Sequence, residues 1–230
     1  MNTEDINKEV SEIVTLLKNV NSSYSVREAY CDLIDLWVIL IGANAKGNLP
    51  EAAPDTFQRL HTKYSATGLK QLYIIIQKSA YLIKTTYRDI LGRIHMNVGS
   101  NKQLQQFFTP DSISELMAAL TYESLPEKDN VISDMCVGSG GLILGYIRYM
   151  KNQGIDLTNT LFVLNDIDLF CCKMCFIQMS IVGAAAEITC SDALSDPQTE
   201  GSSFTGYWLK TPVLSSIETI LSEAKTWTNI

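Results

Sequence analysis

The sequence predicts an α/β protein, with an all-helical domain over residues 1–100 and a second domain over residues 101–230 that is built on a parallel sheet. Of its 230 residues, 46% are hydrophobic and 19% are charged, which suits a chain that buries a core. The first hundred residues carry apolar side chains at helical spacing, with almost no alternation of period two. Beyond Phe108, short apolar runs alternate with helical stretches, which is typical of parallel strands joined by crossover helices.

The clearest helix of the first domain is expected from about residue 69 to residue 91. Apolar side chains recur there every three or four residues and form one stripe: Leu69, Tyr73, Ile76, Ala80, Ile83, Tyr87 and Ile90. Lys70, Lys84 and Arg88 lie on another face of the same helix, together with Gln77. We expect this face to point outward.

These basic residues belong to a longer stretch of positive charge. Residues 57–106 contain eight basic residues and the single acid Asp89, a net charge of +7, although the whole chain carries −7. The overall charge argues against a generic nucleic-acid binder, whereas the local patch can hold a polyanion such as DNA. A solvated helix face is the alternative explanation.

The second domain is expected to contain four strands and four helices. The predicted strands span residues 131–135, 161–165, 187–190 and, more weakly, 206–209. The predicted helices span residues 111–120, 141–152 and 169–182, and a last helix follows Pro212. Thr109 and Pro110 precede the first of these helices, where a cap residue and a proline both favour helix initiation.

Several classes of protein and site are not indicated. The longest apolar run, residues 36–43, is shorter than the roughly 20 residues of a membrane-spanning helix. The six cysteines are irregularly spaced, so we expect reduced thiols and a cytoplasmic protein. Cys172 and Cys175 form a C-x-x-C spacing, but no second pair or nearby histidine completes a tetrahedral site, and we expect no bound metal.

The residues that point to chemistry follow the first two predicted strands. The run from Asp134 to Gly141, with glycines at 138, 140 and 141, stands between a strand and an apolar helix, as in a nucleotide-cofactor site. The next strand ends in Asn165 and Asp166, and Asp166 comes 28 positions after Gly138. An acid at that place can hold two ribose hydroxyls. A plain strand-to-helix connection and turn-capping acids remain the structural alternatives.

These features resemble the N-6 adenine-specific DNA methylase family, in particular the modification subunit of type I restriction systems and its short plasmid- and phage-borne relatives. The resemblance extends over about residues 87–194. It rests on Asp-Ile-Leu-Gly-Arg-Ile at 89–94, Gln-Phe-Phe-Thr-Pro at 106–110, the glycine run at 134–141, Asn-Asp-Ile-Asp at 165–168 and Ser-Asp-Ala-Leu at 191–194. It implies a shortened Rossmann-like, S-adenosylmethionine-dependent methyltransferase domain.

The resemblance also implies a set of cofactor contacts. Phe108, Thr109 and Pro110 match the family's cofactor motif ahead of the first strand. The glycine run, Gly138, Ser139, Gly140 and Gly141, would lie under the methionine portion of S-adenosylmethionine. Asp134 would orient that run and meet the cofactor ammonium, Asp166 would hold the ribose, and Asp192 would read the adenine amino group.

The sequence departs from the family at the acceptor motif. An amino methylase of this kind carries Asn-Pro-Pro-Phe or a close variant at the end of its fourth strand. The asparagine side chain and the proline carbonyl accept hydrogen bonds from the target amine, and the aromatic ring stacks on the flipped base. No Asn-Pro-Pro occurs in these residues, and Lys210, Thr211, Pro212 and Val213 stand at the corresponding place. A lysine ammonium only donates hydrogen bonds and cannot do the work of the asparagine, which argues against ordinary amine methylation by this chain alone.

Three functions follow as hypotheses. The first is an S-adenosylmethionine-binding, DNA adenine-N6 methyltransferase-like protein whose acceptor groups come from another chain. The second is a non-catalytic, methylase-like DNA-binding or partner subunit of a mobile-element modification system. The third is an enzyme that methylates another acceptor. In each case a shortened sheet with an exposed edge predicts a second subunit or a homodimer.

Overall fold

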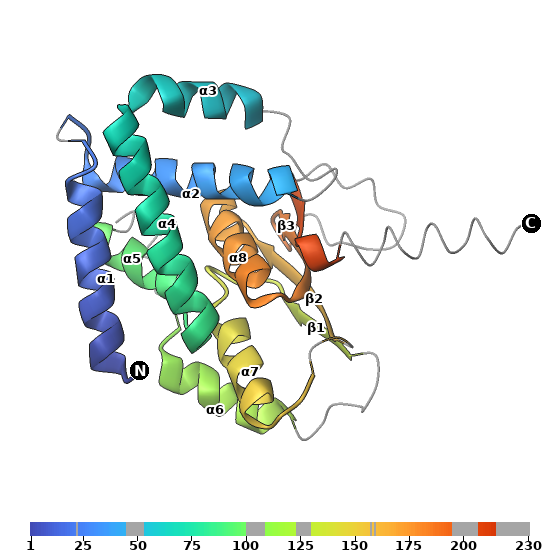
Figure 1. Ribbon diagram of the computed structural model, residues 1–230. Helices are drawn as coiled ribbons and strands as arrows, with labels where there is room; N and C mark the ends of the chain where they lie inside the picture. The colour runs from blue at the N-terminus through green and yellow to red at the C-terminus, as the bar shows by residue number, and fades with distance from the viewer. Residues whose placement is uncertain are drawn as a thin grey trace, which may run out of the picture.

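A computed structural model gives the architecture of the chain (Figure 1). It describes residues 1–21, 23–44, 53–99, 109–122, 130–156, 158, 160–194 and 207–214. Phe108 and most of the helix predicted after Pro212 lie outside these ranges. Among the described helices, none has both the length and the apolar character that a membrane crossing requires.

The described residues before 100 are helical, as the sequence predicts. The helices are α1 (Thr3–Lys18), α2 (Val26–Asn44), α3 (Ala53–Lys63), α4 (Ala66–Thr86) and α5 (Ile90–Val98). Side chains cap the starts of two of these helices. Asn2 and Asp5 form a reciprocal capping box at α1, and the Ser65 side chain accepts a hydrogen bond from the Gly68 amide at α4.

The single long helix expected over residues 69–91 is wrong, because the chain breaks between α4 and α5. Tyr87 ends α4 in the left-handed conformation, with φ 51°. Asp89 then caps α5, and its side chain accepts a hydrogen bond from the Gly92 amide. The apolar spacing continues through both helices, so periodicity could not show the break. An N-cap acid three residues before a glycine was the signal that could have shown it.

The second half contains the predicted α/β unit. In chain order it consists of α6 (Asp111–Tyr122), β1 (Asn130–Asp134), α7 (Gly141–Asn152), β2 (Thr160–Asp166), α8 (Leu169–Val182), β3 (Ala185–Cys190) and β4 (Tyr207–Lys210). The described sheet has the order β1-β2-β3-β4. β1, β2 and β3 are parallel, whereas β4 runs antiparallel to β3.

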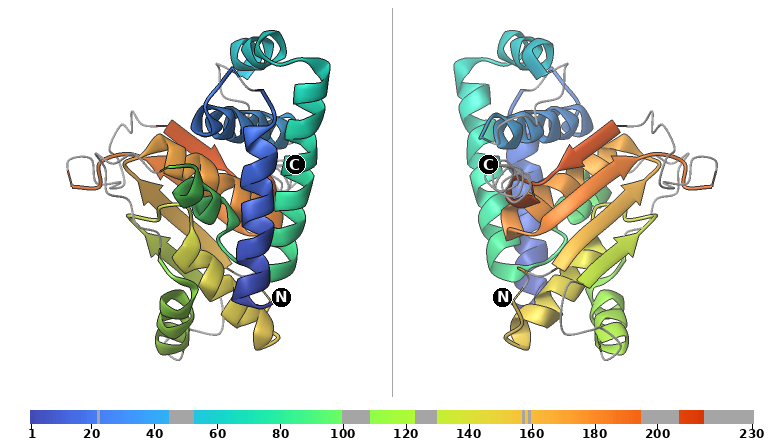
Figure 2. Two further views of the ribbon diagram at one scale, coloured as in Figure 1. Left: turned by 90° about the vertical axis from the view of Figure 1, so that its left-hand side faces the viewer. Right: turned by 90° about the vertical axis from the view of Figure 1, so that its right-hand side faces the viewer.

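Both crossover helices, α7 and α8, cover the same face of the sheet, because the strands progress in one direction (Figure 2). Phe162, Leu164 and Ile188 point to this face and are fully buried. On the other face Val131 is 62% exposed, and no described helix covers it. The described part of the sheet therefore corresponds to one half of a doubly wound fold.

One continuous core joins the two halves of the chain. The core cluster includes Leu33 of α2, Leu72 of α4, Phe176 of α8 and Ile188 of β3. α8 lies between the sheet and the N-terminal helices, and nine of its fourteen residues are buried, in keeping with its largely apolar sequence. The division of the chain at residue 100 stays a prediction.

Candidate functional site at the carboxyl edge of the sheet

The loops that follow β1, β2 and β3 are held together by one buried side chain, Asn165. Its Nδ2 donates to the carbonyl oxygens of Met135, at 3.3 Å, and Ser191, at 3.0 Å. Its Oδ1 accepts from the hydroxyls of Thr189 and Ser191, both at 2.9 Å. Since each loop comes from a different strand, Asn165 fixes their relative positions at the edge where parallel strands present their carboxyl ends.

The glycine turn after β1 is attached to the end of β2. The Gly138 amide donates to Asp166 Oδ2 at 2.7 Å, and the Val137 amide donates to the Asn165 carbonyl at 2.9 Å. Gly138 and Gly140 have φ of 58° and 94°, which side-chain-bearing residues rarely adopt. The structure thus brings together two of the features that the sequence predicts as a cofactor site, the glycine turn and Asp166.

The start of α7 lies directly behind this turn. Gly140 occupies the N-cap position, and no side chain caps the helix there. The first amides of α7 therefore keep hydrogen-bonding capacity for an anionic group. A Cβ at Gly140 would lie 3.2 Å from Cys175 Sγ, so glycine also lets the turn approach α8 closely.

A buried polar network connects the turn to α5 and α8. Asp89 accepts from the Ser139 hydroxyl, from Gln178 Nε2 at 2.9 Å and from the Gly92 amide at 2.8 Å. Gln178 also donates to the Ser139 carbonyl at 2.7 Å. Burial raises the pKa of Asp89 above its ordinary value, although its three hydrogen bonds act in the opposite direction.

Sequence reasoning assigned no role to Asp89 or Gln178. Asp89 stands within the run at 89–94 that carries the family resemblance, and Gln178 is a polar residue inside an otherwise apolar helix. A buried polar side chain in such a helix needs partners, and that requirement was the available signal.

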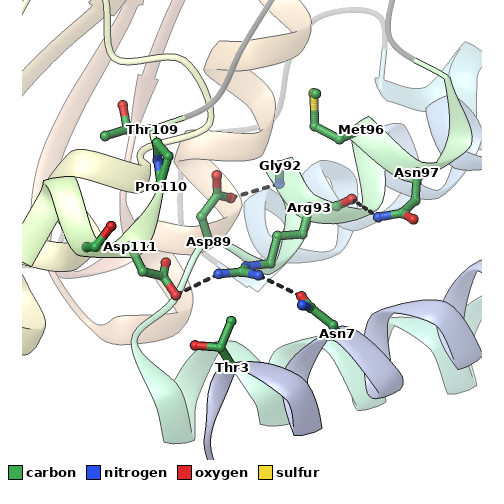
Figure 3. A pocket seen from close by; sticks show the side chains of 11 residues that line it. Thr3, Asn7, Asp89, Gly92, Arg93, Met96, Asn97, Thr109, Pro110 and Asp111 are labelled. Carbon is green, nitrogen blue, oxygen red and sulfur yellow. Dashed lines mark hydrogen bonds and ion pairs between the residues drawn. The ribbon is translucent and has the colours of Figure 1, made fainter.

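A cavity of about 450 Å³ lies next to this network, between α1, α5 and the start of α6 (Figure 3). Asp89, Thr109 and Pro110 line it, and Arg93 crosses it from α5. Arg93 donates to Asp111 at 2.6 Å and to Asn7 at 2.8 Å. The volume of the cavity lies within the range of small-molecule sites, about 300–1,000 Å³.

The remaining cofactor residues expected from the sequence are less closely grouped. Thr109 and Pro110 line the cavity, and a Cβ at Gly141 would lie 3.6 Å from the Thr109 carbonyl oxygen. Asp134 accepts from the Cys136 amide at 3.0 Å and lines a different groove beside β1. Asp192 is exposed and accepts from the Leu194 amide at 3.0 Å.

The segment expected at the acceptor position lies elsewhere. Because β4 is antiparallel to β3, Lys210 pairs with Glu187, near the start of β3. The Thr211 hydroxyl donates to the Ala184 carbonyl at 2.7 Å, and the Thr211 amide donates to the Ala186 carbonyl at 2.9 Å. Lys210, Thr211, Pro212 and Val213 therefore stand at the opposite end of the sheet from the glycine turn. Spacing along the chain could not show the reversed direction of β4.

Most of the basic residues between 57 and 99 are paired with acids. Asp32 pairs with Arg59 and Lys63, Glu9 and Glu12 pair with Lys78, and Asp111 pairs with Arg88 and Arg93. The outward position expected for Arg88 is thus corrected, because its guanidinium faces α6. Lys70 and Lys84 are exposed on α4, as expected.

The comparison with protein families gives a match. The model of a family described as N-6 DNA methylase matches residues 83–219, more than half of the chain. No curated protein matches.

Two solved structures resemble the chain at low identity. One is a type I restriction-modification system methyltransferase subunit from Streptococcus thermophilus, 11% identical, with a TM-score of 0.47 and coverage of 89% of this chain and 62% of that one. The other is a putative class I S-adenosylmethionine-dependent methyltransferase from Listeria monocytogenes, 18% identical, with a TM-score of 0.45 and coverage of 84% and 56%. The chain spans less than two thirds of the length of either.

Proposed function

Because the chain belongs to the N-6 DNA methylase family, we propose that it binds S-adenosylmethionine at the carboxyl edge of its sheet and serves DNA adenine-N6 methylation, with the acceptor groups supplied by another chain. The observation that carries this proposal is the hydrogen bond between the Gly138 amide and Asp166. It places an acid beside a glycine turn and a helix start that no side chain caps, a combination suited to an adenosyl ligand.

The residues at this edge fit the cofactor chemically. Each Asp166 oxygen accepts one backbone amide, from Gly138 or from Asp168, and so retains a lone pair for a ribose hydroxyl. The uncapped amides at the start of α7 suit the methionine carboxylate. When bound, S-adenosylmethionine supplies an activated methyl group.

Thr109, Pro110 and Asp192 complete the proposed contacts. Thr109 and Pro110 are exposed, and they line the cavity that also contains Asp89. The exposed Asp192 carboxylate, which follows β3, can accept a hydrogen bond from the adenine amino group. Asp134 accepts from the Cys136 amide and so orients the start of the turn.

Transfer of the methyl group to an adenine amine needs acceptor groups at the same edge of the sheet. No Asn-Pro-Pro occurs in these 230 residues, and the segment from Lys210 to Val213 stands at the opposite end of the described sheet. This arrangement supports the proposal that the acceptor groups belong to a different chain.

Calorimetric titration of the full chain with S-adenosylmethionine tests cofactor binding. We expect one-site binding that Asp166→Ala weakens at least tenfold, because loss of a charged hydrogen-bond acceptor costs roughly 1.5–3 kcal/mol. Asp156→Ala is the matched control, since Asp156 is an exposed acid after α7 that accepts from Thr158, and it should bind like the wild type. Absence of binding by the wild type, with retained helical circular dichroism, contradicts the proposal.

A second candidate function is a non-catalytic partner subunit of a modification system. The position of Lys210 to Val213 favours it, because no described side chain at the turn matches the acceptor motif. An assay for transfer of radiolabelled methyl groups to adenine-containing DNA separates the two candidates. We expect no transfer by the chain alone, and transfer once its partner is added. Lack of transfer with the partner present selects the second candidate.

A further inference from the structure

Thr109 and Pro110, which stand among the proposed cofactor contacts, lead directly into α6. The Pro110 carbonyl accepts from the amides of Ile113, at 3.0 Å, and Ser114, at 3.1 Å, so these two residues move with the start of the helix. A Cβ at Gly141, the first residue of α7, would lie 3.6 Å from the Thr109 carbonyl oxygen. The position of Thr109 and Pro110 beside the glycine turn therefore depends on what holds the start of α6.

One side of α6 is held by packing on α7. Ser114 and Ala118 are buried, and a Cβ at Gly145 of α7 would lie only 2.5 Å from the Cβ of Ser114. Arg148 of α7 donates to Glu115 at 2.7 Å. Among the described helices, α6 packs extensively on α7, whereas it makes little backbone contact with α1 or α5. Packing thus leaves the side of α6 that faces α1 and α5 without direct support.

The cavity of about 450 Å³ lies on that unsupported side, and Arg93 crosses it (Figure 3). Arg93 donates to Oδ2 of Asp111, the first residue of α6, at 2.6 Å and to Asn7 of α1 at 2.8 Å. Arg88, which precedes α5, donates to the same oxygen of Asp111. One carboxylate oxygen thus receives two guanidinium groups and joins the start of α6 to α5 and, through Arg93, to α1.

These ion pairs are partly shielded from water. The side chains of Arg88, Arg93 and Asp111 are 17%, 23% and 15% exposed. Salt screens charges at such positions less than it screens surface pairs, and removal of one partner leaves the other charge uncompensated. The contacts of Asp111 are therefore suited to hold the residues that precede it in the chain.

We propose that Arg93 and Asp111 are positioning residues of the cofactor site, whose ion pair holds Thr109 and Pro110 beside the start of α7. This inference rests on the proposed function, because it requires that S-adenosylmethionine contacts Thr109 and Pro110. Arg93 and Asp111 act through these two residues and do not touch the cofactor. Loss of the ion pair lets the start of α6 move into the cavity, and the cofactor must then restore the lost order when it binds, which lowers its affinity.

Calorimetric titration of the full chain with S-adenosylmethionine tests the proposal. Arg93→Gln and Asp111→Asn should each weaken binding roughly tenfold, which lies within the usual range of coupling between contacting groups. Arg93→Lys keeps a positive charge opposite Asp111 and should recover part of the affinity that Arg93→Gln loses. All variants are compared under conditions in which circular dichroism shows the helix content of the wild type.

The matched control is Arg59→Gln. Asp32 of α2 pairs with Arg59 and Lys63 of α3, as Asp111 pairs with two arginines, but none of these three residues lines the cavity. Arg59→Gln should therefore bind S-adenosylmethionine like the wild type, even where it lowers the midpoint of urea unfolding. This control separates an effect on the cofactor site from an effect on overall stability.

Three results would contradict the inference, and they differ in what else they contradict. Wild-type affinity in folded Arg93→Gln and Asp111→Asn overturns the inference and leaves the proposed function intact. An equal loss of affinity in Arg59→Gln also overturns it, because the effect then belongs to overall stability. Absence of binding by the wild type contradicts the proposed function, and the inference falls with it. If Arg93→Gln does not fold, Asp111→Asn and Arg93→Lys decide, and wild-type affinity in both overturns the inference.

Discussion

At the scale of single residues, Asp89 helps to hold the glycine turn in position. Its carboxylate accepts from Ser139 of the turn, from Gln178 of α8 and from the Gly92 amide of α5. A Cβ at Gly92 would lie 2.5 Å from Ser139 Oγ, so the elements meet closely around this acid. Asp89 therefore connects the N-terminal helices to the candidate cofactor site.

Asp89 should give the stability of the protein a specific pH dependence. Burial raises its folded-state pKa above the ordinary value of 3.8, so the folded state binds the proton more tightly than the unfolded state does. Its contribution to stability is fully present below pH 3.8 and is lost as pH rises through the folded-state pKa. Asp89→Asn removes this titration. It also keeps the hydrogen bonds, since the amide oxygen accepts from Gly92 and the amide nitrogen donates to Ser139.

Urea unfolding of the wild type and Asp89→Asn at several pH values measures this effect. Asp32 and Glu12 have lowered pKa values and stabilise the fold as pH rises, but they are common to both proteins and cancel in the difference. The variant is expected to gain stability relative to the wild type as pH rises above 3.8. A difference that does not change with pH would show that Asp89 does not titrate in this range.

At the scale of elements, the close contact between α6 and α7 requires a glycine at position 145 of α7, opposite Ser114 of α6. Gly145→Ala should destabilise the protein by about 1–3 kcal/mol, because its Cβ meets the Ser114 side chain. Adding Ser114→Gly removes that side chain and should recover part of the loss, since the two sites are in contact. Chemical denaturation of both single variants and the double variant gives the coupling. Strict additivity would contradict the packing described here.

Of the three basic residues expected to point outward on one face of α4, two lysines are exposed in the structure. Lys70 and Lys84 are exposed, whereas Arg88 pairs with Asp111. If this face contacts DNA, Lys70→Gln/Lys84→Gln should lower the slope of log affinity against log salt by about 2, because each phosphate contact contributes about 0.9. Lys18→Gln/Lys151→Gln removes the same charge from exposed positions on α1 and α7, and it should leave the slope unchanged. Equal slopes for both variants would show that the α4 lysines are only solvated.

Sequence patterns predicted the elements with strong local signals and missed those set by tertiary contacts. α7 (Gly141–Asn152) and α8 (Leu169–Val182) begin and end where the sequence predicts, because glycines and an N-cap acid mark their ends. The break at Tyr87 and the antiparallel direction of β4 were not predicted. Apolar periodicity continues across the break, and the direction of a strand relative to its neighbour is not encoded in the spacing of strands along the chain.

At the scale of the whole molecule, the core extends without interruption from the N-terminal helices through α8 to the sheet. The candidate site lies where these parts meet, since Asp89 precedes α5, Ser139 belongs to the glycine turn, and Gln178 lies in α8. The glycine turn and Asp166 were predictable because motif order along the chain reflects strand order. The supporting roles of Asp89, Gln178 and Asn165 were not predicted, because these roles consist of contacts between distant segments.

The most direct test of the central claim is a titration of the isotope-labelled chain with S-adenosylmethionine, followed by ¹⁵N–¹H correlation spectra. We expect the amide signals of Gly138, Ser139 and Asp166 to shift in proportion to saturation, while those of α3 and the middle of α4 stay in place. Asp166→Ala should weaken the response, and Asp156→Ala should not. Shifts confined to other elements, or no shifts at saturating cofactor, would contradict the assignment of the cofactor site to this edge of the sheet.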